Sequence, residues 1–584
     1  MKNFIITLSL LCFLNSFNLN AQGYLKAKGK RIVNEKNENV LLRGIGLGGW
    51  MLQEGYMLGI NTDGQQYRIR ERIEALIGKK QMEQFYESWL RNHTTKADID
   101  SLKAWGFNSV RLPMHYNLYT PAVDEEPVAG QNTWLEKGFA LTDSLLNWCK
   151  SNNMYLILDL HAAPGGQGND LNISDRNPAK PSLWESEANQ KKMIALWQEL
   201  AKRYVNEPWI AGYDIINEPN WGFQDPVKDK NGTAEQLNIP LRKLMVDITH
   251  AIRQVDKKHL IIIEGNGWGN NYNGILPAWD DNMVLSFHKY WNQNDEASIS
   301  NILNYREKYN IPVWLGETGE NSNVWFTEAI SLLERNNIGW AWWPLKKLNV
   351  NNPLQIRSNP NYDQVVRYWN SKGDKPAESN AYNGLIELAA SSNIKTNIIH
   401  YDVIDAMIRQ PFSTGTKPFK TLRITDGSAE INAVDYDLGR SGFAYFDRDS
   451  ANYHISTGKR SEWNRGRIYR NDGVDIRKSN EGNEYYYVSD IEDGEWLQYS
   501  LDVAVPGKYT LDLELSADSD GGRITVLSGG TNLSENVSLP KTDTEKWQVV
   551  KVGEVILHKG INKLKIRADK GGFKFKTLKL KKIV

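Results

Sequence analysis

Two short stretches decide the fold predicted for this chain. Residues Tyr213–Pro219 read YDIINEP and residues Ile311–Glu317 read IPVWLGE. Each is an apolar run flanked by helical patterns, which is typical of a buried parallel strand. Each run carries a glutamate at its end, Glu218 or Glu317. Because (β/α)₈ barrels place reactive side chains at the C-terminal ends of their strands, the two carboxylates are expected to face one site.

Six further apolar runs extend this pattern from about residue 41 to about residue 345, with helical segments between them. Repeated strand–helix units predict a parallel sheet, and eight units in about 300 residues fit a closed (β/α)₈ barrel. The eight expected strands are Leu41–Gly46, Asn108–Met114, Tyr155–His161, Ile210–Glu218, His259–Gly265, Met283–Tyr290, Ile311–Glu317 and Ile338–Pro344.

After about Leu422 the pattern changes to short alternating strands separated by turn residues such as Pro506-Gly507. Regularly spaced short strands of this kind predict a β-sandwich of jelly-roll type. The expected organisation is therefore an α/β barrel domain over residues 22–410, a linker over 411–430 and a β-sandwich over 431–584.

The N-terminal 21 residues have the pattern of an export signal. Lys2 gives a positive start, and Phe4–Leu14 is an apolar stretch too short to span a bilayer. Cleavage after Ala21 would leave Cys149 as the remaining cysteine of the two in the chain, which excludes an intramolecular disulfide. We therefore expect a secreted, periplasmic or cell-surface protein that relies on its hydrophobic cores, with Cys149 among them.

The composition argues against several classes of partner. The 584 residues carry a net charge of +0, which gives no reason to expect nucleic acid as a partner. No segment after the N-terminal one is apolar enough to suggest a membrane span. We expect a monomer without a cofactor.

Two carboxylates at one site match the chemistry of glycoside hydrolysis, which needs one acid/base and one nucleophile or base. The motifs around them are specific. Together they resemble glycoside hydrolase family 5, a retaining (β/α)₈ family, and supply all eight of its functional positions in order. These positions are Arg111 in VRLP, His161 in LDLH, Asn217 and Glu218 in NEP, His288 and Tyr290 in SFHKY, Glu317, and Trp343.

The resemblance implies a role for each of these residues. Glu218 would be the general acid/base and Glu317 the nucleophile, with Arg111 and Tyr290 keeping Glu317 ionised. The remaining four would contact the sugar or the acid: Asn217 would bind the 2-hydroxyl, His161 and His288 would orient hydroxyls or the acid, and Trp343 would form the floor under the scissile sugar. No metal site is implied.

A second Asn-Glu-Pro sequence lies eleven residues earlier, at Asn206–Pro208. It follows a helical segment and precedes the expected strand that begins at Ile210. This order places Glu207 at the N-terminal rim of the barrel, where residues serve folding, so we assign it no catalytic role.

Three features narrow the substrate by resemblance to the exo-β-1,3-glucanase branch of the family. They are GIGLGGW at Gly44–Trp50, LDLHAAPGGQ at Leu158–Gln167, and the long segment Glu54–Thr95. We expect cleavage of β-glucan, with β-1,3-glucan first. The sequence at Trp291–Gln293 departs from that branch, so endo or exo action and β-1,6-glucan, β-1,4-glucan or mannan stay open, as does a non-catalytic glycan-binding protein. Trp221, Trp268 and Trp291 follow strand ends and are candidates either for sugar subsites or for core packing.

The C-terminal part from about Ile431 resembles carbohydrate-binding module family 6, through DYD at 435–437, GFAYFD at 442–447 and GEWLQY at 494–499. Three positions depart from that family. Asp490 replaces an aromatic wall of the sugar clamp, Val434 replaces a calcium-ligating glutamate, and Lys576 adds a positive charge beside the calcium site. We expect an altered or missing clamp and no calcium, and the domain then either binds glycan on its concave face or packs on the barrel.

Overall fold

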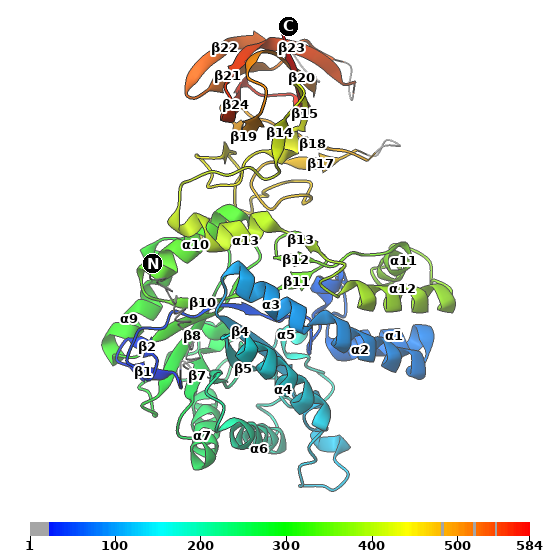
Figure 1. Ribbon diagram of the computed structural model, residues 1–584. Helices are drawn as coiled ribbons and strands as arrows, with labels where there is room; N and C mark the ends of the chain where they lie inside the picture. The colour runs from blue at the N-terminus through cyan, green and yellow to red at the C-terminus, as the bar shows by residue number, and fades with distance from the viewer. Residues whose placement is uncertain (1–22, 480–483, 518–520, 543–545, 584) are drawn as a thin grey trace, which may run out of the picture.

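Eight parallel strands close into a barrel, as the sequence predicts (Figure 1). The computed structural model describes residues 23–479, 484–517, 521–542 and 546–583, so the expected signal segment 1–21 lies outside the described residues. The barrel strands, in the order in which they pair, are β3 (Arg43–Gly46), β4 (Ser109–His115), β5 (Tyr155–Ala162), β6 (Ile210–Asp214), β7 (Leu260–Glu264), β8 (Met283–Lys289), β9 (Val313–Gly319) and β10 (Gly339–Trp343), with β10 returning to β3.

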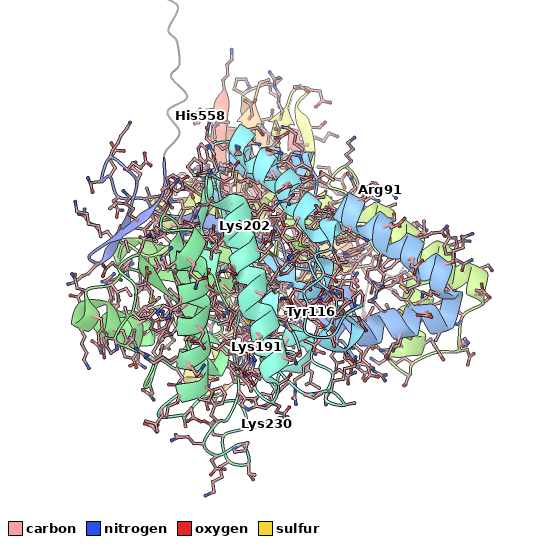
Figure 2. The ribbon with its side chains drawn as sticks, turned by 90° about the horizontal axis from the view of Figure 1, so that it is seen from below. Arg91, Tyr116, Lys191, Lys202, Lys230 and His558 are labelled. Carbon is pink, nitrogen blue, oxygen red and sulfur yellow. The ribbon has the colours of Figure 1, made fainter. Side chains whose placement is uncertain are left out.

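The helices that connect these strands pack their apolar faces on the barrel. In α7 (Ile239–Val255), for example, Leu241, Leu244, Ile248 and Ile252 are buried at helical spacing. Figure 2 shows α6 (Glu187–Tyr204) beside α7, with Lys191 and Lys202 on its outer face. The other surrounding helices are α3 (Lys96–Trp105), α4 (Glu136–Ser151), α9 (Ser300–Tyr309) and α10 (Asn323–Arg335), and Cys149 of α4 lies in the core, as expected.

Four helices form a separate unit on one side of the barrel, at the right of Figure 1. They are α1 (Gln66–Ile77), α2 (Lys79–His93), α11 (Pro360–Trp369) and α12 (Glu378–Ser391), and they share a hydrophobic core of their own. The sequence did not predict this unit, because its two helix pairs are far apart along the chain.

The C-terminal domain is a β-sandwich of two sheets, as expected. β14 (Leu422–Ile424) and the start of β15 (Ser428–Asn432) lie within the segment 411–430 and pair with sandwich strands, so strand pairing begins before residue 431. One sheet has the order β14-β19-β24-β21-β22 with β16 beside β19, and the other has the order β17-β18-β25-β20-β23 with β15 beside β25. The remaining strands are β16 (Tyr445–Phe446), β17 (Ile476–Lys478), β18 (Tyr486–Val488), β19 (Trp496–Val503), β20 (Gly507–Ser516), β21 (Arg523–Ser528), β22 (Thr531–Ser538), β23 (Gln548–Leu557), β24 (Gly560–Lys570) and β25 (Lys574–Lys582).

The two domains are in direct contact, with α10 and α13 (Tyr401–Ile408) between the barrel and the sandwich (Figure 1). The backbone N–H of Asn323 donates to the carbonyl of Asn471 over 2.9 Å, and the Asn471 N–H donates to Asp402 over 2.7 Å. These residues are buried, so the sandwich is docked on the barrel rather than tethered to it. Among the described helices, none combines the length and apolar character needed to cross a bilayer.

Candidate active site

Glu218 lies four residues beyond the end of β6, which stops at Asp214 rather than at the expected Glu218. The chain leaves the sheet here, and Glu218 adopts a positive φ of 42°. Its backbone N–H donates to Glu264 Oε2 over 2.7 Å, which holds this unusual conformation in place. The residue is 5% exposed and lines the cleft at the barrel's C-terminal opening.

Glu317 lies within β9, at a β-bulge. Leu315 pairs with Phe287 of β8 and Glu317 pairs with His288, so Gly316 is the extra residue. A Cβ atom on Gly316 would lie 2.2 Å from Ser286 Oγ, which explains why glycine occupies this position. The bulge re-aims the strand, and the Glu317 side chain lines the same cleft as Glu218.

The two carboxylates are close together. One ligand atom each from Glu218, His288 and Glu317 lie within 4.8 Å of one another. By residue type and spacing this group could also hold a metal ion, although we expected none. His288 Nδ1 lies 2.6 Å from Glu218 Oε1, which commits that nitrogen to the carboxylate in this arrangement.

Arg111 lies at the centre of a buried charge network. It is fully buried, and its Nη1 donates to Glu317 Oε2 over 2.9 Å. Its Nε donates to Asp214 over 3.0 Å and its Nη2 donates to Asn217 Oδ1 over 2.7 Å. Two more carboxylates, those of Asp159 and Glu264, lie 3.3 and 3.2 Å away. This arrangement holds the Glu317 carboxyl group in place through the Arg111 guanidinium.

His161 and Asn217 are neighbours. His161 Nδ1 lies 2.8 Å from Asp159 Oδ2, and its Nε2 lies 3.3 Å from Asn217 Nδ2. The imidazole stacks on the indole of Trp343 with ring centres 5.0 Å apart. Asn217 is fully buried and does not line the cleft, so its contact with a sugar hydroxyl stays a prediction.

Tyr290 and Trp343 both line the cleft, and each donates one hydrogen bond there. The Tyr290 hydroxyl donates to Glu317 Oε1 over 2.8 Å, as the resemblance implied. The Trp343 indole N–H donates to the Tyr56 hydroxyl over 2.9 Å, which fixes the ring at the cleft. Glu317 therefore receives a hydrogen bond on each of its oxygens, which fixes the orientation of its carboxyl group in the cleft.

The surroundings of Glu218 favour its protonated form. Burial raises the pKa of Glu218 to about 7, with nearby Glu317 and Glu264 adding to the rise and His288 opposing it. Burial alone would lower the pKa of His288, but the carboxylates of Glu264, Glu317 and Glu218 outweigh it and raise that pKa well above its usual value. One carboxyl group that holds a proton near neutral pH beside a hydrogen-bonded carboxylate gives the site an acid and a nucleophile.

Sequence reasoning missed several residues of this site. Asp159 is two positions before His161 and therefore shares its face of the strand, a signal that could have found it. Glu264 ends the apolar run LIIIE, as Glu218 and Glu317 end theirs, and was overlooked. Glu54 comes from the long segment after β3, and burial together with Glu317 raises its pKa well above its usual value. Glu54 does not end an apolar, strand-like run, so the sequence gives no signal that identifies it as a site residue.

The cleft above these residues has a volume of about 760 Å³. Trp268 and Trp291 line it, whereas Trp221 is not among its lining residues and packs under the Arg176 guanidinium. Ile455 of the sandwich domain also lines the cleft. The predicted positions that line it are His161, Glu218, His288, Tyr290, Glu317 and Trp343, while Arg111 and Asn217 are buried beside it.

The second Asn-Glu-Pro lies where expected, just before the N-terminal end of β6, and Glu207 pairs with Lys150 over 2.8 Å. In the sandwich, Asp490 pairs with Arg477 over 3.0 Å and Lys576 pairs with Glu514 over 2.8 Å. Val434 is buried in the sandwich core.

Comparison with known protein families gives one match in each of the two domains. Residues 70–349 match the model of the Cellulase family (glycosyl hydrolase family 5). Residues 470–580 match carbohydrate binding module family 35. The C-terminal resemblance to family 6 is therefore not confirmed, because the match in that part of the chain is to family 35.

Three relatives each match about half of this chain. A beta-xylosidase of Phanerodontia chrysosporium is 32% identical over 270 residues, which cover 46% of this chain and 52% of that protein. Endoglucanase C of Acetivibrio thermocellus is 25% identical over 370 residues, or 52% of this chain and 91% of that protein. A glucan 1,3-beta-glucosidase of Candida oleophila is 26% identical over 273 residues, or 44% of this chain and 57% of that protein.

The chain thus spans about half the length of the first and third of these relatives. The match to the family model, the closed parallel barrel and the paired carboxylates at its C-terminal opening all agree. Residues 70–349 of the barrel domain are thus similar to glycosidases of glycosyl hydrolase family 5.

Proposed function

We propose that this protein is a secreted, retaining glycoside hydrolase that cleaves β-glucan through a covalent glycosyl–Glu317 intermediate. Glu317 attacks the anomeric carbon while Glu218 gives its proton to the leaving oxygen. The bond to the leaving sugar breaks as the Glu317 ester forms. Glu218 then takes a proton from water, which attacks the anomeric carbon as the bond between that carbon and Glu317 breaks, releasing the sugar and the Glu317 carboxylate.

The spacing of the two carboxylates carries this proposal. Retaining glycosidases have carboxyl groups about 5–5.5 Å apart, whereas inverting enzymes need about 6.5–9.5 Å to admit a water molecule. One oxygen of Glu218 and one of Glu317 lie within 4.8 Å of each other, and this close approach of the two carboxyl groups is compatible with the retaining arrangement.

The sequence resemblance and the relatives indicate the substrate only at the level of a broad class of polysaccharides. The sequence around the first and third strands resembles the exo-β-1,3-glucanase branch, and one relative is named a glucan 1,3-beta-glucosidase. β-1,3-Glucan is therefore the first substrate to test. Two other relatives are named a beta-xylosidase and an endoglucanase, so β-xylosides, β-1,4-glucan, β-1,6-glucan and mannan belong to the same panel.

The test is product analysis on laminarin, a β-1,6-glucan, carboxymethylcellulose, mannan and xylo-oligosaccharides. Wild type is expected to release β-configured products from laminarin first, seen by NMR before mutarotation. Glu317→Gln should release none, and Glu218→Gln should slow cleavage roughly 10²–10⁴-fold. Glu207→Gln is the matched control, because it alters the second Asn-Glu-Pro and should keep activity within about twofold.

Each contrary result has a distinct meaning. Products of α configuration would contradict retention. Activity confined to another polymer would keep the mechanism and replace the substrate. No cleavage of any polymer would favour a non-catalytic glycan-binding protein. Processing at Ala21 during secretion is tested by N-terminal sequencing of the exported protein, and the proposed monomer by light scattering.

A further inference from the structure

A second pocket opens beside the catalytic cleft, between the two domains. It has a volume of about 250 Å³ and shares three lining residues, Tyr56, Trp291 and Glu320, with the cleft. The barrel supplies its remaining wall from residues 347–351, and the sandwich supplies residues 452–471. The pocket is therefore continuous with the cleft, and residues of both domains form its walls.

The sandwich wall is held against the barrel by specific contacts. The Ile455 N–H donates to the Trp291 carbonyl over 3.1 Å, and the Gln293 N–H donates to Ser456 Oγ over 2.8 Å. The rings of Trp291 and His454 lie 5.1 Å apart. The segment Trp291–Gln293, which departs from the related glucanases, thus serves as the docking point for α14 (His454–Thr457).

The charges that line the pocket are mostly positive. They are the cations Lys347, Arg460, Arg467 and Arg470 and one anion, Glu320. Lys347 is neutralised by Glu320 at 2.6 Å, and Arg470 is neutralised by Asp472 at 2.6 Å. Two guanidinium groups, those of Arg460 and Arg467, then remain for a ligand.

These two guanidinium groups are weakly engaged. Among the described residues Arg460 has no ion pair or hydrogen bond. Arg467 has a 3.7 Å contact with Glu462, in which both side chains are 63% exposed, and its guanidinium carbon lies 5.8 Å from the centre of the Trp463 ring. On the opposite wall, the buried Oδ1 atom of Asn351 accepts no hydrogen bond from the described residues. The pocket therefore offers donors for an anion and an acceptor for a hydroxyl group.

We infer that this pocket is a substrate subsite for a sugar that carries a carboxylate, such as a uronic acid unit or branch of the polysaccharide. Guanidinium groups bind carboxylates through paired, charge-assisted hydrogen bonds, and Tyr56 and Trp291 give the pocket an aromatic lining of the kind that contacts sugars. The inference rests on the proposed function, because it extends the substrate that the catalytic cleft accepts.

Binding to the full-length Glu317→Gln protein tests this subsite without turnover. The probes are a neutral β-glucan oligosaccharide and the same oligosaccharide bearing one glucuronic acid, titrated by calorimetry. The acidic probe is expected to bind about tenfold more tightly, a preference that should fall in 0.5 M salt. Adding Arg460→Ala and Arg467→Ala should abolish the preference and leave binding of the neutral probe within about twofold.

Arg423→Ala is the matched control, since Arg423 is an exposed arginine of the same domain that pairs with Asp502 at 3.5 Å and lies outside the pocket. Equal binding of the two probes, or a preference that survives loss of both arginines, would overturn the subsite. Laminarin hydrolysis by the wild type is measured in parallel. Selective binding of the acidic probe without hydrolysis of laminarin would overturn the proposed function and support the subsite. Hydrolysis of laminarin without selective binding would support the proposed function and overturn the subsite.

Discussion

The Arg111 guanidinium contacts four buried carboxylates, those of Asp159, Asp214, Glu264 and Glu317. One cation cannot neutralise four anions in a site of low polarity, so protons must be taken up. Burial and the neighbouring Glu264 raise the pKa of Asp214 well above its usual value, and His288 is likewise biased towards its charged form. The site therefore stores protons next to Glu218.

The pKa of Glu218, which His288 lowers, is expected to set the alkaline limit of activity. Glu218 works as an acid only when protonated, so kcat/KM should fall as pH rises through about 7, the pKa of this group. The His288 imidazolium stabilises the ionised Glu218 and so lowers its pKa. His288→Asn should therefore move the alkaline limb of the kcat/KM profile to higher pH, while His558→Asn on the sandwich should leave it in place. A limb that stays put or moves to lower pH would contradict this role.

The residues of the site differ in how well the sequence predicts them. Glu218, Glu317 and Arg111 lie in motifs that place them at strand ends, and the structure brings them together. Glu264 lies in an equally apolar run but in none of these motifs, and Asp159 lies within LDLH, where the resemblance implied a role for His161 alone. Strand pairing around the barrel decides which charged side chains meet in its interior. The sequence of one apolar run does not reveal that pairing.

At the scale of the element, the bulge in β9 positions the nucleophile. Gly316→Ala is expected to force a Cβ against Ser286 Oγ, which lies 2.2 Å from the ideal position, and to displace Glu317. Crowding of this kind costs about 1–3 kcal/mol and should lower kcat as well as the unfolding midpoint. Ser286→Gly in the same chain removes the clashing atom and should restore part of both losses, with Ser286→Gly alone as the control. Full activity of Gly316→Ala would show that the bulge does not position Glu317.

The hydrophobic pattern of the sequence predicted the strands and helices that pack against elements close to them in the chain. All eight barrel strands were predicted within a few residues, because each is a short apolar run between helices. The four-helix unit of α1, α2, α11 and α12 was missed, since its core forms between segments at opposite ends of the barrel domain. β14 was assigned to a linker because three residues are too few to show alternation.

At the scale of the whole molecule, buried amides join the two domains. Asn471 Nδ2 donates to the Asn321 carbonyl over 2.9 Å and to Asn323 Oδ1 over 3.1 Å, and its Oδ1 accepts from the Trp463 indole over 3.0 Å. Asn321 Nδ2 donates in turn to the Asn452 carbonyl over 2.7 Å. Glu317 lies in β9, and the loop that follows this strand holds the sandwich segment that lines the cleft.

Asn471→Ala is expected to loosen this junction. It leaves the Trp463 indole N–H and the Asn321 carbonyl without their partner in a buried setting, at a cost of about 1–3 kcal/mol. Calorimetry should then resolve separate unfolding of the sandwich and the barrel where the wild type unfolds cooperatively. Asn206→Ala is the control, because its exposed amide meets only Lys258 among the described residues. If Asn471→Ala unfolds like the wild type, the amide network does not couple the domains, and the sandwich segment at the cleft must be held by its contacts with Trp291 and Gln293.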